Sequence, residues 1–137
     1  GKGKDKDLMD LYKKFNIEAE VKDFYENPES LISWSDFVIS RAGALSISEL
    51  TFLNKPSVLV PSPNVAEDHQ TKNAQVLAAN GAAELINDSN AQNDLITESL
   101  KLVNEPKTLE FMSLKAAELA KPTAADDIVT EIFKLIK

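Results

Sequence analysis

Three short apolar runs, each close to a break marked by Gly or Pro, most constrain the fold of this chain. They lie at 36–40, 57–60 and 82–86. Their residues are apolar without alternation, which is typical of strands that are covered on both faces. Such strands, separated by segments with helical spacing, predict a parallel sheet flanked by helices, an α/β fold.

The remaining segments are mostly helical by the spacing of their apolar residues. We expect helices at 4–15, 29–34, 46–53, 67–79, 95–103, 108–120 and 124–136. The first helix has an apolar stripe formed by Leu8, Leu11, Tyr12 and Phe15. The third helix is expected to bury Leu45, Ile47, Leu50 and Leu53. A further strand is predicted at 17–21, because apolar and acidic residues alternate there.

Composition narrows the classes of function. The chain of 137 residues suits one domain. It has no cysteine, which excludes a disulfide scaffold, thiolate zinc sites and cysteine nucleophiles. Its 15 basic and 22 acidic residues give a net charge of −7, which argues against nucleic-acid binding. No apolar run approaches the roughly 20 residues that a membrane helix needs.

The loop after the first apolar run carries the first candidate site, at 40–49. Ligands of open α/β sheets bind beyond the carboxyl ends of the strands, where loops enter the next helix. Gly43 allows the backbone to approach a ligand closely, and the free amides at 44–46 would attract a diphosphate. Glu49 lies one turn into the helix, where its carboxylate could accept hydrogen bonds from two sugar hydroxyls.

The same spacing has a purely structural interpretation. Ser46-x-x-Glu49 also fits a capping box, in which Ser46 caps the helix and Glu49 bonds back to its amide. Because capping boxes open many helices, the spacing alone favours this interpretation over ligand binding. The role of Arg41 is equally open: it could be a solvent-exposed arginine or could bind a phosphate.

A second marked loop follows the second apolar run, at 61–74. The acidic pair at 67–68 is expected in the first turn of the helix that this loop enters. Gln70 and Asn73 share one helix face, and amides suit sugar hydroxyls because they both donate and accept; solvated amides are the plainer alternative. His69 is the only histidine, so we expect no metal site.

Both loops match one known signature. The strings SRAGALSISE at 40–49 and DHQTKNA at 68–74, with prolines at 56 and 61, closely resemble the nucleotide-sugar signature of the MurG family of bacterial N-acetylglucosaminyltransferases. The coarser pattern Gly-x-x-Ser-x-x-Glu, then Pro, then Gln-x-x-Asn is similar to that of two-domain (GT-B) glycosyltransferases. The resemblance covers residues 1 to about 86 and implies a Rossmann-like C-terminal domain, with a helical tail at about 91–137.

The resemblance also implies roles for the residues of the two loops, with UDP-N-acetylglucosamine as the ligand. The residues implied for the UDP diphosphate are Arg41, Gly43, Ala44, Leu45 and Ser46. Glu49 is implied for the uridine ribose. The residues implied for the N-acetylglucosamine are His69, Gln70 and Asn73. No metal or other cofactor is implied, because enzymes that resemble this chain stabilise the leaving diphosphate with helix dipoles and amides.

The implied reaction is the transfer of N-acetylglucosamine to lipid I, which forms lipid II in peptidoglycan synthesis. In the family, the N-terminal domain carries the lipid I site and the candidate catalytic base. We therefore expect residues 1–137 to be a truncated C-terminal domain that binds the sugar donor and is inactive alone. The implied location is the bacterial cytoplasm, with the parent enzyme peripheral on the inner membrane. Sheet edges left exposed by the truncation could drive dimerisation.

Two other classes of protein stay open. One is another GT-B enzyme, such as a UDP-N-acetylglucosamine epimerase, but that class resembles Asp-Ser-Gly-Gly where this chain has Arg-Ala-Gly-Ala at 41–44. The other is a non-catalytic α/β interaction or receiver-type module. A receiver needs an acidic residue at the carboxyl end of a strand, whereas Asp36 begins its predicted strand.

Overall fold

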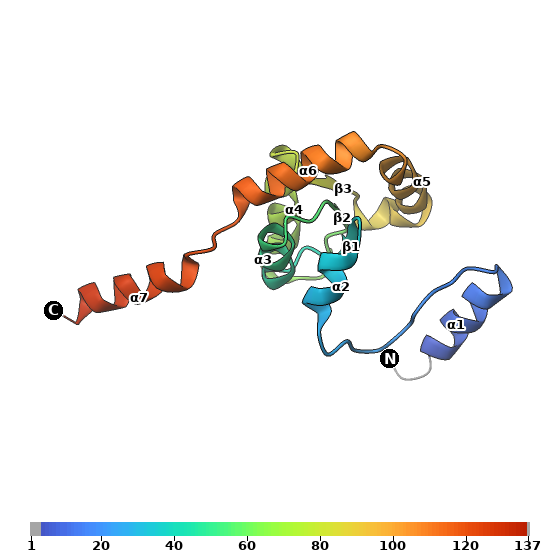
Figure 1. The fold of residues 1–137 in the computed structure, drawn as a ribbon, viewed down its shortest axis with the longest axis horizontal. Helices are drawn as coiled ribbons and strands as arrows, with labels where there is room; N and C mark the ends of the chain where they lie inside the picture. Colours follow the sequence, from blue (N-terminus) through green and yellow to red (C-terminus); the bar gives the residue numbers. More distant parts are fainter. Residues whose placement is uncertain (1–3, 137) are drawn as a thin grey trace.

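The computed structural model describes residues 4–136, in which strands and helices alternate before a helical C-terminal region (Figure 1). The helices and strands are α1 (Lys4–Lys14), α2 (Pro28–Trp34), β1 (Val38–Ser40), α3 (Ala44–Phe52), β2 (Ser57–Leu59), α4 (His69–Ala79), β3 (Ala83–Leu85), α5 (Ala91–Val103), α6 (Pro106–Leu119) and α7 (Ala124–Leu135). Single 3-10 turns at Ala66–Asp68 and Asp88–Asn90 precede α4 and α5.

The strands of the described chain form one parallel sheet in the order β1-β2-β3. Val38 pairs with Ser57, and Ser57 pairs with Ala83. Because the strands are parallel, their carboxyl ends meet at one edge, where the loops into α3, α4 and α5 begin. The predicted α/β fold is confirmed, and all three strands lie within the three predicted apolar runs.

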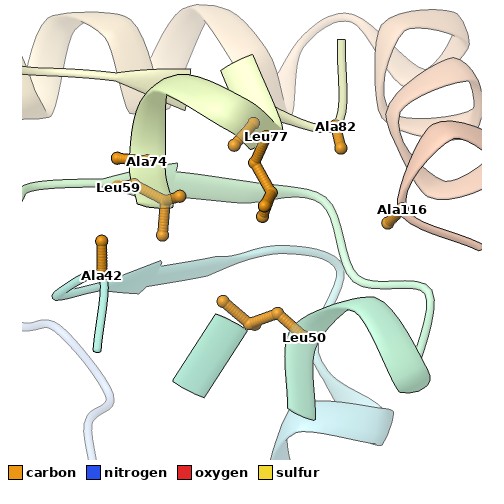
Figure 2. Close-up of a cluster of buried hydrophobic side chains, with 8 residues drawn as sticks. Ala42, Leu50, Leu59, Ala74, Leu77, Ala82 and Ala116 are labelled. Carbon is orange, nitrogen blue, oxygen red and sulfur yellow. The ribbon is translucent and has the colours of Figure 1, made fainter. Parts of the chain in front are cut away.

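Helices cover both faces of the sheet. On one face, Leu59 of β2 packs with residues of α3, α4 and α6, among them Leu50, Leu77 and Ala116 (Figure 2). On the other face, Val58 packs with residues of α5 and α6. Successive side chains of a strand point to opposite faces, so burial on both sides favours apolar residues at successive positions, as at Val58 and Leu59. This two-sided burial explains why the sequence of β2 does not alternate.

The strand predicted at 17–21 is wrong. This segment is irregular, and Ile17 is 52% exposed. The period-2 pattern is visible in the partial burial of Ala19 and Val21 between exposed acidic residues. A strand also needs a neighbour that pairs its backbone N–H and C=O groups. Within residues 4–136 no strand lies beside this segment, so the pattern alone does not produce one.

The predicted helices all exist, but several begin at other residues. Pro28 and Pro106 are the first residues of α2 and α6, because proline favours the first helical position. Helix α5 begins at Ala91 rather than at 95. Helix α4 begins at His69, not at Glu67 as predicted.

The first and last helices, α1 and α7, lie away from the sheet (Figure 1). Of the apolar stripe predicted for the first helix, Leu8 and Leu11 lie on α1 and are exposed, and Phe15 follows the end of α1 and is exposed as well. No described residue of α7 is buried. Among residues 4–136 there is no helix that combines the length and the apolar character required to cross a membrane.

Candidate functional site

The candidate site lies at the carboxyl end of the sheet, where the two predicted loops are neighbours. The loop after β1 leads into α3, and the loop after β2 leads into α4. The last backbone hydrogen bond between these strands joins the Val60 N–H to the Ser40 carbonyl, at 2.9 Å. Beyond this bond, side chains determine how the loops are held together.

Helix α3 begins with unpaired backbone amides. Gly43 is its N-cap residue, with an extended conformation (φ −65°, ψ 149°) and no side-chain cap. The first helical hydrogen bond runs from the Ile47 N–H to the Gly43 carbonyl, at 2.9 Å. The N–H groups of residues 44–46 therefore have no acceptor among the described residues. A helix start of this kind attracts anions.

The capping-box interpretation of Ser46 and Glu49 is wrong. Ser46 is the third residue of α3 and not its cap, because Gly43 already adopts the N-cap conformation. The Glu49 carboxylate has no hydrogen bond or ion pair with any described residue and is only partly buried. The structure therefore removes the local structural role that the spacing favoured for Glu49.

A cavity of about 660 Å³ lies between α3 and α4, beside the start of α3. Three of the predicted site residues line it: Ala44, Glu49 and Asn73. Leu119 at the end of α6, Lys121 after it and Ala124 at the start of α7 also line this cavity. Glu49 therefore faces an open volume that it shares with the first residue of α3.

The predicted burial of Leu45 is wrong, since 74% of this residue is exposed. Leu50 is buried as predicted, and Ile47 and Leu53 are partly buried. Because α3 begins at Ala44, Leu45 lies in its first turn, beyond the core. Leu45 contributes an unpaired amide at this end of the helix, while its side chain lies outside the core.

Arg41 joins the ends of all three strands. Its Nη1 donates to the Val60 carbonyl at 3.1 Å and to the Pro61 carbonyl at 3.4 Å. The same nitrogen forms an ion pair with Asp88, in the loop after β3. Arg41 is therefore more than a solvent-exposed side chain, because its guanidinium holds these loops together.

The role of Asp88 was not predicted from the sequence. This residue and Arg41 are 47 positions apart, so no local spacing relates them. The only signal in the sequence is an acidic residue soon after the third apolar run.

Gln70 and Asn73 lie on one face of α4, as predicted, and each anchors one loop. The Ser62 N–H donates to Oε1 of Gln70 at 2.9 Å, and Nδ2 of Asn73 donates to the Ala42 carbonyl at 3.1 Å. Each amide has a second polar group, Nε2 of Gln70 and Oδ1 of Asn73, without a partner among the described residues.

His69 is exposed and is the first residue of α4. Glu67 and Asp68, immediately before it, have positive φ angles of 56° and 53°. This left-handed conformation is uncommon for residues other than glycine, and it cannot continue a right-handed helix. It explains why the predicted first turn at 67–68 lies outside α4.

Comparisons with known proteins assign this chain to one family. The family model for the glycosyltransferase family 28 C-terminal domain matches residues 1–128. Two curated relatives are 49% identical over 121 residues (Porphyromonas gingivalis) and 52% identical over 114 residues (Parabacteroides distasonis). Both are named UDP-N-acetylglucosamine–N-acetylmuramyl-(pentapeptide) pyrophosphoryl-undecaprenol N-acetylglucosamine transferase. These matches cover 88% and 83% of the chain, but 32% and 31% of the relatives.

A solved structure agrees with the sequence relatives. The crystal structure of MurG from Acinetobacter baumannii superposes with a TM-score of 0.88 and 31% sequence identity. The match covers 98% of this chain and 41% of that one. The chain spans about a third of the length of the curated relatives it matches. From its sequence and its fold, the chain belongs to glycosyltransferase family 28 and corresponds to the C-terminal part of MurG, a GT-B glycosyltransferase.

Proposed function

We propose that residues 1–137 are the nucleotide-sugar-binding domain of an enzyme that transfers N-acetylglucosamine from UDP-N-acetylglucosamine to lipid I, forming lipid II. The observation that carries this proposal is the start of α3, where unpaired amides adjoin a cavity lined by a free carboxylate, Glu49. The names of the curated relatives support a UDP-N-acetylglucosamine donor and an undecaprenyl-linked acceptor.

The UDP diphosphate binds at the start of α3 in this proposal. The amides of Ala44, Leu45 and Ser46 donate to its oxygens, and the positive end of the helix dipole stabilises the charge that develops on the leaving UDP. Gly43 and Arg41 form the frame of this loop. Their part is supported by the N-cap conformation of Gly43 and by the bonds from Arg41 to the loop after β2.

Glu49 binds the uridine ribose. A carboxylate can accept hydrogen bonds from two vicinal hydroxyls at once. The absence of a partner for Glu49 among the described residues supports this role, since the carboxylate has no competing interaction. Its place in the same cavity as Ala44 allows one nucleotide to reach both.

The N-acetylglucosamine moiety binds at the start of α4, to His69, Gln70 and Asn73. The free Nε2 of Gln70 can donate to a sugar hydroxyl, and the free Oδ1 of Asn73 can accept from one. The opposite end of each amide is bonded to a loop, which fixes the direction of the free end. The site needs no metal or other cofactor in this proposal.

The acceptor, lipid I, binds to an N-terminal domain in the complete enzyme, which acts in the bacterial cytoplasm as a peripheral protein of the inner membrane. Residues 1–137 alone are expected to be inactive for this reason. This division of roles is consistent with the length of the curated relatives, of which the chain covers about a third.

Isothermal titration calorimetry of the complete enzyme with UDP, UDP-glucose and UDP-N-acetylglucosamine tests the proposal. We expect all three to bind, with UDP-N-acetylglucosamine tighter than UDP-glucose, because only the acetylated sugar matches the proposed subsite. Failure to bind any of the three would contradict the proposal. Equal affinity for the two nucleotide sugars would contradict the sugar assignment while leaving the UDP site intact.

We also propose that the isolated chain dimerises through the free edge of β1. No described strand pairs with the outer side of β1, and Ile39 on this strand is 45% exposed. An unpaired edge offers backbone groups to a second copy. Sedimentation equilibrium of the 137-residue chain is expected to give a concentration-dependent dimer that Ile39→Lys weakens. A monomer at every concentration would contradict this proposal.

A further inference from the structure

A single guanidinium connects the loops that follow β1, β2 and β3. Backbone pairing of the sheet ends with the bonds from Val60 N–H to Ser40 O and from Ile86 N–H to Leu59 O, at 2.9 and 3.0 Å. Beyond these bonds, Arg41 reaches the Val60 and Pro61 carbonyls and the carboxylate of Asp88. The position of the loop after β1 therefore depends on an acidic residue that belongs to the loop after β3.

Asp88 is the strongest of the three acceptors. Hydrogen bonds to an ionised acceptor are shorter and stronger than those to carbonyl groups, and the Pro61 carbonyl lies 3.4 Å from Nη1, near the limit for a hydrogen bond. Asp88 thus contributes most to fixing the direction of the guanidinium.

Close packing does not fix Arg41 independently of Asp88. A cavity of about 290 Å³ lies beside the pair, lined by Ile39, Val60, Ala91 and Leu95 as well as by Arg41 and Asp88. The Arg41 side chain is 56% exposed. Without the carboxylate, the guanidinium would have room to move.

We propose that Asp88 is a positioning residue for the sugar-donor diphosphate. Through Arg41, it holds the turn at 41–43, so that the amides of residues 44–46 keep one direction before the ligand binds. This inference rests on the proposed function, because it assigns the diphosphate to those amides. Hydrogen-bond donors that are oriented in advance bind a developing charge without the cost of reorganisation.

The exposure of the Arg41–Asp88 ion pair distinguishes a positioning role from a role in global stability. An ion pair between exposed side chains contributes little to the free energy of unfolding. We therefore expect Asp88→Asn to leave the melting temperature of the enzyme nearly unchanged. Its effect should be confined to the loops and to the affinity for the nucleotide.

The test compares Asp88→Asn with Asp94→Asn in the complete enzyme. Asp94 lies in the first turn of α5, is exposed and makes no described ion pair, so its substitution removes the same charge nearby. The first readout is hydrogen exchange of the Ile47 and Val60 amides without ligand, since they are bonded to Gly43 in the loop after β1 and to Ser40 at the end of β1. We expect several-fold faster exchange in Asp88→Asn and no change in Asp94→Asn.

The second readout is the affinity for UDP. Asp88→Asn should bind UDP several-fold more weakly, with a raised KM for UDP-N-acetylglucosamine and a smaller change in kcat, and Asp88→Glu should recover most of the loss. Unchanged exchange, or faster exchange with unchanged UDP affinity, would overturn the positioning role. If the unsubstituted enzyme bound no UDP, the proposed function would fail and the positioning role with it, whereas the exchange rates would still show whether Asp88 orders the loop.

Discussion

Ala44→Pro is expected to weaken the binding of UDP to the complete enzyme by about ten- to a hundredfold, while helix α3 stays folded. Proline has no backbone N–H, so the substitution removes one of the unpaired amides at 44–46 that we assign to the diphosphate. A hydrogen bond to a charged group is worth about 1.5–3 kcal/mol, which corresponds to this range of affinity.

The local geometry makes Ala44→Pro a clean substitution. Ala44 is the first residue of α3, the position at which helices accept proline best. Gly43 has ψ 149°, which is the conformation that a residue before proline prefers, and Ala44 is exposed. Ala44→Gly is the control, because it also changes the side chain but keeps the amide. If both variants bound UDP equally well by calorimetry, the amide of residue 44 would not contact the diphosphate.

Glu49→Ala is expected to reduce UDP affinity by about tenfold or more with little loss of stability. The carboxylate makes no described hydrogen bond, so its removal should change the free energy of unfolding by no more than about 0.5 kcal/mol. The loss of bonds from a charged acceptor to the ribose hydroxyls should cost about 1.5–3 kcal/mol in binding. Calorimetry with UDP and urea denaturation measure the two quantities separately.

Glu110→Ala is the control for Glu49→Ala. Glu110 is an exposed carboxylate on α6, so its removal gives the same change of net charge away from the site. Its UDP affinity should equal that of the unsubstituted enzyme. A Glu49→Ala variant that lost about 1 kcal/mol of stability, the usual value of a helix cap, but kept its UDP affinity would restore the structural interpretation of this residue.

The sheet could be predicted from the sequence because strands buried on both faces have apolar residues without alternation. Val58 and Leu59 point to opposite faces of β2 and both are fully buried, so both positions favour apolar residues. The segment 17–21 has a different pattern, in which apolar and acidic residues alternate. Its alternation describes one exposed and one partly buried side, but not the neighbouring strand that would pair its backbone.

The start of α3 could be predicted only in part. Ser46 and Glu49 have the spacing of a capping box, yet Gly43 caps the helix through its backbone conformation alone. Such a cap has no side-chain signal, so the predicted helix began too late. With the start displaced, Leu45 was wrongly assigned to the core.

In the second loop, the helical period correctly placed Gln70 and Asn73 on one face. Their partners, the Ser62 amide and the Ala42 carbonyl, are backbone groups that reach them only after the sheet has formed. The same holds for the pair of Arg41 and Asp88. Spacing along a chain shows which side chains share a face of one helix, whereas contacts between loops follow from the tertiary fold.

The most direct test of the central claim is a two-dimensional ¹H–¹⁵N NMR titration of the 137-residue chain with UDP-N-acetylglucosamine. We expect the largest shift changes at the backbone amides of residues 44–46 and at the side-chain amides of Gln70 and Asn73. The amides of α1, which lies away from the sheet and lines neither described cavity, should stay unchanged. Shift changes that avoid 44–46, or none at a ligand concentration that saturates the complete enzyme, would contradict the claim that this helix start binds the nucleotide sugar.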